Sequence, residues 1–239
     1  MAEQQVKSRE RVAQHGEVFT AQREVNAMLD MVQDETERIE SRFLEPACGE
    51  GAFLKEILRR KLVAVREQHG RRHADFEFYS ILAVSTLYGV DILADNVEIC
   101  RENLYQIWNE AYTADVTKAN ARLKKERRPA AERNNELCRE NVKFILSKNI
   151  LCGDALTMKH ADGSPIIFAE WSLPRQIQRK DYALDKMLDG HSKQPSLNFD
   201  AMNARGWTYD VEIDALVPAP VREYEPREYT KLIDTDSGV

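Results

Sequence analysis

The stretch Phe43-Leu-Glu-Pro-Ala-Cys-Gly-Glu-Gly-Ala-Phe-Leu54 decides the fold of this chain. Its first three residues predict the end of a short buried strand, and Pro46 stops that strand because proline lacks the N–H that a sheet requires. Gly49 and Gly51 predict a tight turn, and Ala52 begins a predicted helix. A strand, a glycine turn and a helix together form the half-unit that binds nucleotide-like ligands at the carboxyl end of a parallel sheet.

The spacing of the glycines separates this turn from other nucleotide-binding loops. The segment lacks the lysine of a phosphate-binding loop, and it lacks the third glycine of the dinucleotide fingerprint. Glu45 precedes the turn, where its carboxylate would repel a pyrophosphate. A carboxylate there suits a ligand that carries an amino group and hydroxyls, such as S-adenosylmethionine. An ordinary strand-turn-helix corner is the alternative interpretation of the same glycines.

Two further apolar runs each end near an acidic residue. Leu87-Tyr-Gly-Val-Asp-Ile92 predicts a second strand, and Asp91 at its end can accept hydrogen bonds from both hydroxyls of a ribose. Ile92 can pack on an adenine ring. A third strand is expected within Phe144–Leu156, and Asp154 in the corner after it can accept the amine of an adenine. An exposed acid and a Gly-Asp turn are the alternative interpretations.

A helix is expected near the N-terminus, with Thr20 as its cap. Its apolar side chains recur with the period of a buried helix face at Val25, Met28, Leu29 and Val32. Residues 113–140 are strongly charged and include Lys124-Lys-Glu-Arg-Arg128. This segment predicts a solvated helix or a mobile insertion, and contact with nucleic acid is the less favoured interpretation.

The pattern changes after the third predicted strand. A strand is expected over Pro165–Trp171, a short helix over Ala183–Leu188 and an alternating strand over Trp207–Val217. Pro218–Pro226 is predicted to be extended because it is rich in proline. The sequence therefore divides into an N-terminal helical segment (1–40), a cofactor-binding core (41–160) and a diverged C-terminal part of the same domain (161–239).

Composition excludes several classes of protein. A chain of 239 residues is long enough for one α/β domain with additions, and no apolar run approaches the ~18 residues of a membrane span. The first ten residues are polar and charged, unlike a signal peptide. The four cysteines are scattered, which predicts a reduced, cytoplasmic protein without a structural metal site. A net charge of -6 argues against a free-standing nucleic-acid binder, although a local basic cleft is compatible with it.

The strand-end motifs, in this order, resemble those of the class I S-adenosylmethionine-dependent methyltransferases. The chain looks most like the DNA adenine-N6 methyltransferases of restriction-modification systems. The matching segments are Leu44–Leu54, Tyr88–Ile92, Gly153–Leu156 and, for the N-terminal motif, Gly16–Thr20 with the helix after it. The resemblance implies a Rossmann-like α/β fold with a mostly parallel sheet flanked by helices, in which the C-terminal part of the sheet is incomplete or diverged.

The resemblance also implies a site for S-adenosylmethionine. The residues implied at the methionine end are Thr20, Glu45, Ala47, Gly49 and Gly51. The residues implied at the ribose and the adenine are Asp91, Ile92, Asp154 and Ala155. The sequence names no catalytic residue and no metal ligand.

The chain departs from the family at the loop that receives the target base. Adenine methyltransferases of this group carry Asn/Asp-Pro-Pro-Tyr/Phe after the fourth strand, where the flipped base is bound and stacked. No two prolines are adjacent anywhere in this sequence. The nearest echo is Phe199–Gly206, where Asn203 is followed by Ala204-Arg205 in place of both prolines.

Three hypotheses follow from the sequence. The chain is an active DNA methyltransferase with a divergent target loop, or one that acts on another substrate. Alternatively, it binds the cofactor while a partner methylase or specificity subunit supplies DNA recognition, and an incomplete sheet would leave an open edge for such a partner. The third hypothesis is a non-catalytic homologue that works by binding. DNA, reached through a local cleft or a partner, and a homo-oligomer are the expected associations, without a membrane.

Overall fold

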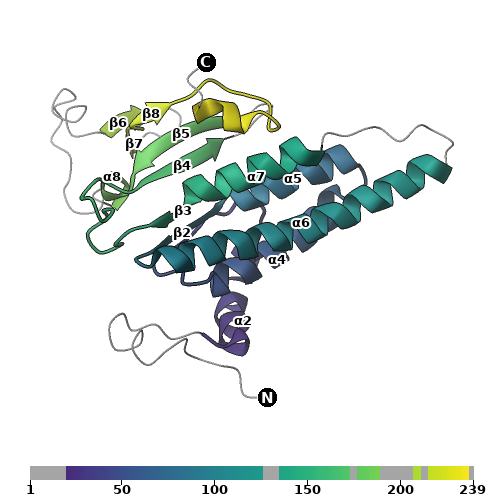
Figure 1. Cartoon of the computed structure of the whole chain (residues 1–239), viewed down its shortest axis with the longest axis horizontal. Coiled ribbons are helices and arrows are strands. Elements are labelled where there is room, and N and C mark those ends of the chain that lie inside the picture. The colour runs from purple at the N-terminus through teal and green to yellow at the C-terminus, as the bar shows by residue number, and fades with distance from the viewer. Residues whose placement is uncertain (1–19, 126–134, 173–176, 189–206, 211–214, 237–239) are drawn as a thin grey trace.

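A small parallel sheet lies at the centre of the computed structural model, which describes residues 20–125, 135–172, 177–188, 207–210 and 215–236 (Figure 1). Its strands, in spatial order, are β1 (Phe43–Glu45), β2 (Leu87–Asp91) and β3 (Ile150–Cys152). Phe43 pairs with Leu87, and Asp91 pairs with Cys152, so all three strands run in the same direction. The chain therefore has an α/β fold with a three-stranded parallel sheet flanked by helices.

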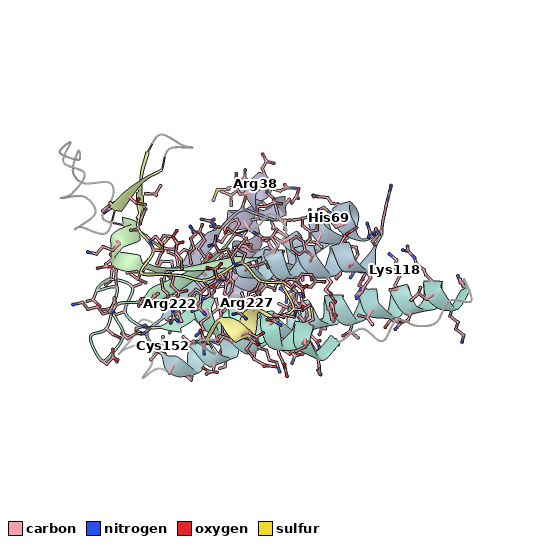
Figure 2. The ribbon with its side chains drawn as sticks, turned by 90° about the horizontal axis from the view of Figure 1, so that it is seen from above. Arg38, His69, Lys118, Cys152, Arg222 and Arg227 are labelled. Atoms are coloured by element: carbon pink, nitrogen blue, oxygen red, sulfur yellow. The ribbon has the colours of Figure 1, made fainter. Side chains whose placement is uncertain are left out.

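The helices that connect these strands form the larger part of the core. They are α4 (Ala52–His69) and α5 (His73–Ser85) between β1 and β2, then α6 (Ala94–Lys125) and α7 (Asn135–Asn149) between β2 and β3. The apolar residues of α4 recur every three or four residues along one face and are buried there: Ile57, Leu58, Leu62 and Val65. α6 projects beyond the other helices, and Lys118 on it lies toward the opposite end of the molecule from Cys152 (Figure 2).

The two faces of β2 pack against different layers. On one face, a Cβ added to Gly89 would lie 3.1 Å from the side chains of Cys48 and Leu54, which belong to the helical layer. On the other face, Tyr88 and Val90 pack in a cluster with Ile166, Phe168 and Leu184. The parallel sheet is thus covered by helices on one side and by the C-terminal half of the chain on the other.

The C-terminal strands form antiparallel sheets instead of extending the parallel one. One sheet contains, in spatial order, β4 (Ile167–Ser172), β5 (Gln178–Ala183) and β8 (Arg222–Glu223), and the short helix α8 (Leu184–Leu188) follows β5. The other contains β6 (Trp207–Asp210) and β7 (Ala215–Pro218). The 3-10 helix η2 (Leu232–Asp236) follows the extended segment after β7. The strands of the C-terminal part therefore form sheets separate from the parallel one, whereas their divergence from a methyltransferase sheet stays a prediction.

Three local predictions are wrong. Thr20 is not a helix cap, because α2 (Gln22–Asp30) follows Ala21 and no side chain caps it. Only half of the predicted apolar stripe is buried: Met28 within α2 is 51% exposed, and Val32, which lies after the end of α2 and before the short α3 (Gln33–Glu37), is 45% exposed. Residues 144–149, expected in the third strand, form the last turns of α7, whose face buries Cys138, Val142 and Ile145. An apolar run alone does not separate a buried helix from a strand.

Other predictions are refined or lie outside the described residues. The charged segment is helical up to Lys125 and again from Asn135, whereas 126–134 are not described. The single strand expected over Trp207–Val217 consists of two paired strands. The segment containing Asn203 and most of the N-terminal motif lie outside the described ranges. The division into three segments stays a prediction.

No helix in the described part of the chain combines the length and apolar character needed to cross a membrane.

A buried polar network attaches the C-terminal segment to the helices. The hydroxyls of Tyr112 and Tyr229 each donate to the carboxylate of Glu77 at 2.6 Å, and His73 Nδ1 lies 2.6 Å from an oxygen of Asp115. Burial alone would raise the pKa of Glu77, but hydrogen bonds from His73, Tyr112 and Tyr229 outweigh it and lower this pKa to about 2. The ionised carboxylate of Glu77 is therefore the form that the folded chain stabilises.

The stability of the chain should consequently fall in acid. Because the pKa of Glu77 is lower in the folded state than its ordinary 4.5, the unfolded chain takes up the proton more readily as the pH decreases. We expect the free energy of unfolding to drop by up to about 3 kcal/mol between about pH 4.5 and pH 2, from this residue alone. Urea unfolding at pH 7, 4 and 3 measures this loss.

Tyr229→Phe tests the origin of this acid sensitivity. Removal of one hydroxyl donor should lower stability at pH 7 by about 1–2 kcal/mol and flatten the loss in acid. Tyr105→Phe is the matched control, because Tyr105 is a half-buried tyrosine outside the network. Parallel pH profiles for Tyr229→Phe and the unchanged chain would show that the network does not set the pKa of Glu77.

Candidate functional site

The carboxyl ends of the three parallel strands carry the acidic residues singled out in the sequence. Glu45 ends β1 and Asp91 ends β2, while Asp154 follows β3 by two residues. Since the strands are adjacent and parallel, these residues lie along one edge of the sheet. Two backbone hydrogen bonds join the loops there: the Cys48 N–H donates to Val90 O, and the Gly153 N–H donates to Asp91 O, both at 2.9 Å. The three motifs are therefore neighbours in space.

The carboxylate of Asp91 connects the first two motifs directly. Its Oδ2 accepts a hydrogen bond from the backbone N–H of Gly49 at 2.9 Å. Its Oδ1 accepts from the N–H of Leu93 at 2.9 Å and from Nδ2 of Asn96 at 3.3 Å. A carboxylate has about four acceptor positions, so Asp91 keeps capacity for a further donor while it holds the glycine turn against β2.

The glycine turn depends on backbone conformations that other residues rarely adopt. Gly49 has φ +51° and Gly51 has φ +83°, both in the left-handed region. A Cβ at Gly51 would lie 2.7 Å from Cys100 Sγ, whereas a Cβ at Gly49 would meet nothing within 4 Å. Gly51 therefore allows the start of α4 to approach α6 closely. Asn103 on α6 supports the same turn, because its Nδ2 donates to Glu50 O at 3.0 Å.

The two glycines provide a matched pair of substitutions. Gly51→Ala should destabilise the chain by about 2–4 kcal/mol, since it combines an unfavourable φ with a clash against Cys100. Gly49→Ala should lower the stability by only about 1 kcal/mol, because it has the unfavourable φ without a clash. Thermal and urea unfolding of both variants measures the difference. Equal losses of stability would mean that the contact between the turn and α6 does not constrain the fold.

The environment of Glu45 suits contact with a cationic group. The residue is half-buried, and burial raises the pKa of its carboxyl, while the backbone N–H of Ala47 acts in the opposite direction. Burial disfavours a lone negative charge, so a positively charged group nearby would restore the ionised form. Ala47 itself is exposed, and its N–H is the group that reaches Glu45.

The residues implied at the adenine lie in a more open part of the edge. The N–H of Leu156 donates to Asp154 Oδ1 at 2.8 Å, and this bond is the main reason why the pKa of Asp154 is lowered. Ala155 packs against the cluster of Tyr88 and Val90. Ile92 is 58% exposed directly after Asp91. An apolar side chain in solvent beside a hydrogen-bonding carboxylate offers a surface on which a flat ring can lie.

Thr20 is the predicted site residue that the structure connects least. Gln22, two residues after it, donates from Nε2 to Glu56 at 3.4 Å, one turn into α4. Arg60 and Asp30 form a second link between α4 and α2 at 2.7 Å. These contacts join α2 to α4, but within the described ranges no hydrogen bond joins Thr20 to the other predicted residues.

Residues on α6 that were not predicted from the sequence support the site. Asn96 is buried and donates to Asp91, while Asn103 donates to the glycine turn. Cys100 lies between them and packs against Gly51. The signal in the sequence is that these two asparagines are seven residues apart, which places them on one face of a helix. The other residues of that face are buried. Such residues hold a site in place when they are directed at its backbone or its ligands.

Two hollows of the described structure lie outside the candidate site. One groove of about 690 Å³ lies between α4 and α6, with Lys55, Arg59 and Glu110 in its walls. A cavity of about 610 Å³ lies between β1 and the antiparallel sheet, and none of the residues implied for the cofactor lines either hollow. Among the residues described, no group of three or more His, Cys, Asp or Glu is arranged to hold a metal.

Comparisons of the chain with known proteins add no relative to this picture. No model of a protein family, no curated protein and no solved structure matches the chain. The geometry of the strand ends is therefore the basis on which a function is assigned to the chain.

Proposed function

We propose that this chain binds S-adenosylmethionine at the carboxyl edge of a Rossmann-like class I methyltransferase fold. The observation that carries the proposal is the hydrogen bond from the Gly49 N–H to Asp91, which joins the glycine turn to the acid at the next strand end. Together with Glu45 and Asp154, it makes a row of carboxylates beside a turn that a ligand can approach closely.

The charge of this row favours one class of ligand. S-adenosylmethionine carries a sulfonium and an ammonium group against one carboxylate, so it is a net cation. Acidic strand ends attract such a ligand, whereas they would repel the phosphates of ATP or of a dinucleotide. In this proposal Glu45 meets the methionine end, Asp91 accepts from a ribose hydroxyl, and Asp154 accepts from the adenine amine. Ile92 then packs on the ring.

The proposed reaction is methyl transfer related to DNA adenine-N6 methylation in restriction-modification systems. Transfer requires the donor methyl group and the acceptor nitrogen to be in line and shielded from water. The chain would supply the cofactor half of this arrangement, in the cytoplasm. A partner methylase or specificity subunit would supply target recognition and the Asn-Pro-Pro-Tyr loop, because the sequence contains no adjacent prolines.

A second candidate function follows from the same missing loop. Without the Asn-Pro-Pro-Tyr motif, the chain fits a non-catalytic homologue that binds the cofactor and acts through association. The two candidates differ in one result. Transfer of labelled methyl groups to DNA, by the chain alone or with a partner chain that carries the motif, would favour the enzyme.

Isothermal titration of the purified chain tests the common part of both candidates. We expect one molecule of S-adenosylmethionine, or of its product S-adenosylhomocysteine, to bind per chain with a micromolar dissociation constant. ATP serves as the control ligand, because it shares the adenosine but carries phosphates. No heat of binding with either cofactor form, or equal binding of ATP, would contradict the proposal.

A further inference from the structure

The cavity of about 610 Å³ beside β1 is separate from the proposed cofactor site. Apolar and aromatic side chains form most of its wall: Phe43, Leu44, Tyr88, Phe168, Tyr182, Leu184, Met187, Val217 and Pro218. Leu44 and Met187 are each 44% exposed, so apolar surface faces solvent at this hollow. A hollow of this size, lined mainly by apolar groups with a few polar ones, is typical of a binding site.

The backbone of Leu44 has hydrogen-bonding groups that its own sheet does not use. The N–H of Phe43 donates to Thr86 O at 3.0 Å, so the peptide groups of Phe43 face β2. Peptide groups of successive residues in a strand face opposite sides, and the N–H and C=O of Leu44 therefore face away from β2. β1 is the edge strand of this sheet, and within the described ranges no strand pairs with its other side.

The opposite wall of the cavity has the periodicity of an extended chain. Phe168, Glu170 and Ser172 face the cavity from β4, and alternate residues of β5 do the same, beginning at Gln178 and including Lys180. Side chains spaced two residues apart repeat about every 7 Å along a strand. An extended peptide that lies between β1 and this wall presents its own side chains at the same spacing.

Charge around the cavity indicates which peptide fits. The lining contains Arg42, Lys180 and Glu170, and Lys180 also pairs with Glu223 at 3.3 Å, so Arg42 is the basic residue that can meet a further acid. Arg42 forms an ion pair with Glu170 yet keeps 57% of its side chain exposed, so donors of its guanidinium remain accessible. An apolar peptide with one carboxylate near Arg42 complements this lining.

We propose that the edge of β1 and the adjacent cavity bind an extended segment of a partner polypeptide. The segment pairs with Leu44 as an added strand, places apolar side chains in the cavity and directs an acidic side chain toward Arg42. Addition of a strand to an open sheet edge is a recurring mode of peptide recognition, in which the backbone supplies affinity and pockets supply specificity. This surface does not depend on the cofactor proposal, because it lies apart from the glycine turn.

A library of random twelve-residue peptides displayed on phage, selected against the full chain, tests the proposal. We expect enrichment of alternating apolar sequences with one Asp or Glu, and weaker binding of the synthetic peptides as salt is raised. Leu44→Pro removes the outward N–H and should weaken binding about tenfold or more, whereas Leu44→Ala keeps that N–H and should weaken it less. Proline is tolerated at this place, since β1 is an edge strand and Phe43 is extended.

Amide exchange in the unchanged chain gives a second readout that needs no variant. The Leu44 amide should exchange quickly in the free chain and slow about tenfold or more when a selected peptide is bound. Failure to enrich any peptide, or peptides that leave the Leu44 amide unprotected, would overturn the proposal. A concentration-dependent dimer that Leu44→Pro abolishes would also overturn it, in favour of a second copy of this chain. If Leu44→Pro loses the peptide and still binds S-adenosylmethionine, the loss arises at the edge of β1 and not at the proposed cofactor site.

Discussion

Replacement of Asp91 with alanine is expected to weaken the binding of S-adenosylmethionine by at least about 100-fold, roughly 3 kcal/mol. The substitution removes the proposed acceptor for a ribose hydroxyl, and a hydrogen bond to a charged group contributes about 1.5–3 kcal/mol. It also removes the acceptor for the Gly49 N–H, so the glycine turn loses one of its hydrogen bonds to β2 and keeps the one from the Cys48 N–H to Val90 O. Isothermal titration of the variant against the unchanged chain measures the loss.

Glu98→Ala is the matched control for Asp91→Ala. Glu98 is a carboxylate in the first turns of α6, its side chain is 72% exposed, and it pairs with Arg101 at 2.8 Å. Its removal should change the dissociation constant less than about threefold. Because Asp91 also supports the fold, thermal unfolding must accompany each titration. A folded Asp91→Ala variant that still binds within threefold of the unchanged chain would refute the assignment of Asp91 to the ribose.

Replacement of Arg179 with methionine is expected to cost about 3–5 kcal/mol of stability. The guanidinium of Arg179 on β5 donates to both oxygens of Asp181, at 2.7 and 2.9 Å, and to Asp236 in η2 at 2.6 Å. It also lies over the ring of Tyr224 at 4.4 Å. Arg179 is 4% exposed and Asp181 is 8% exposed, so the methionine variant leaves a buried carboxylate without its cation. Urea unfolding at pH 7 measures the change.

Two companion variants identify the cause of this loss. Arg222→Met removes an exposed guanidinium over the same Tyr224 ring and should cost less than about 1 kcal/mol. Adding Asp181→Asn to Arg179→Met removes the uncompensated charge and should restore part of the stability. A double variant less stable than Arg179→Met would show that lost contacts, and not a buried charge, explain the effect.

The parts of the fold that sequence analysis predicted are those set by neighbours along the chain. Gly49 and Gly51 predict a left-handed turn because other residues rarely adopt that conformation. The apolar face of α4 follows from a periodicity that is repeated over several turns. Asp91 at a strand end is equally local, and the adjacent parallel strands bring it beside the glycine turn. That Asp91 binds a ribose stays a prediction.

The failed predictions concern boundaries and distant contacts. Residues 144–149 carry apolar side chains that suit either a helix or a strand, and packing of α7 against the other helices decided for the helix. Thr20 has the side chain of a helix cap, but the chain enters α2 through Ala21 instead. A propensity of this kind is worth only about 1 kcal/mol, so tertiary packing readily outweighs it.

By itself, the sequence determined the half-unit of strand, glycine turn and helix, together with the acidic ends of the strands. Only the tertiary structure decided that the Gly49 N–H meets Asp91, that an antiparallel sheet covers Tyr88 and Val90, and that Arg179 lies buried beside Asp181. The physical reason is the separation along the chain of the residues that interact. Turn geometry and periodicity act within a few residues, whereas these contacts join separate elements and form only when the layers pack.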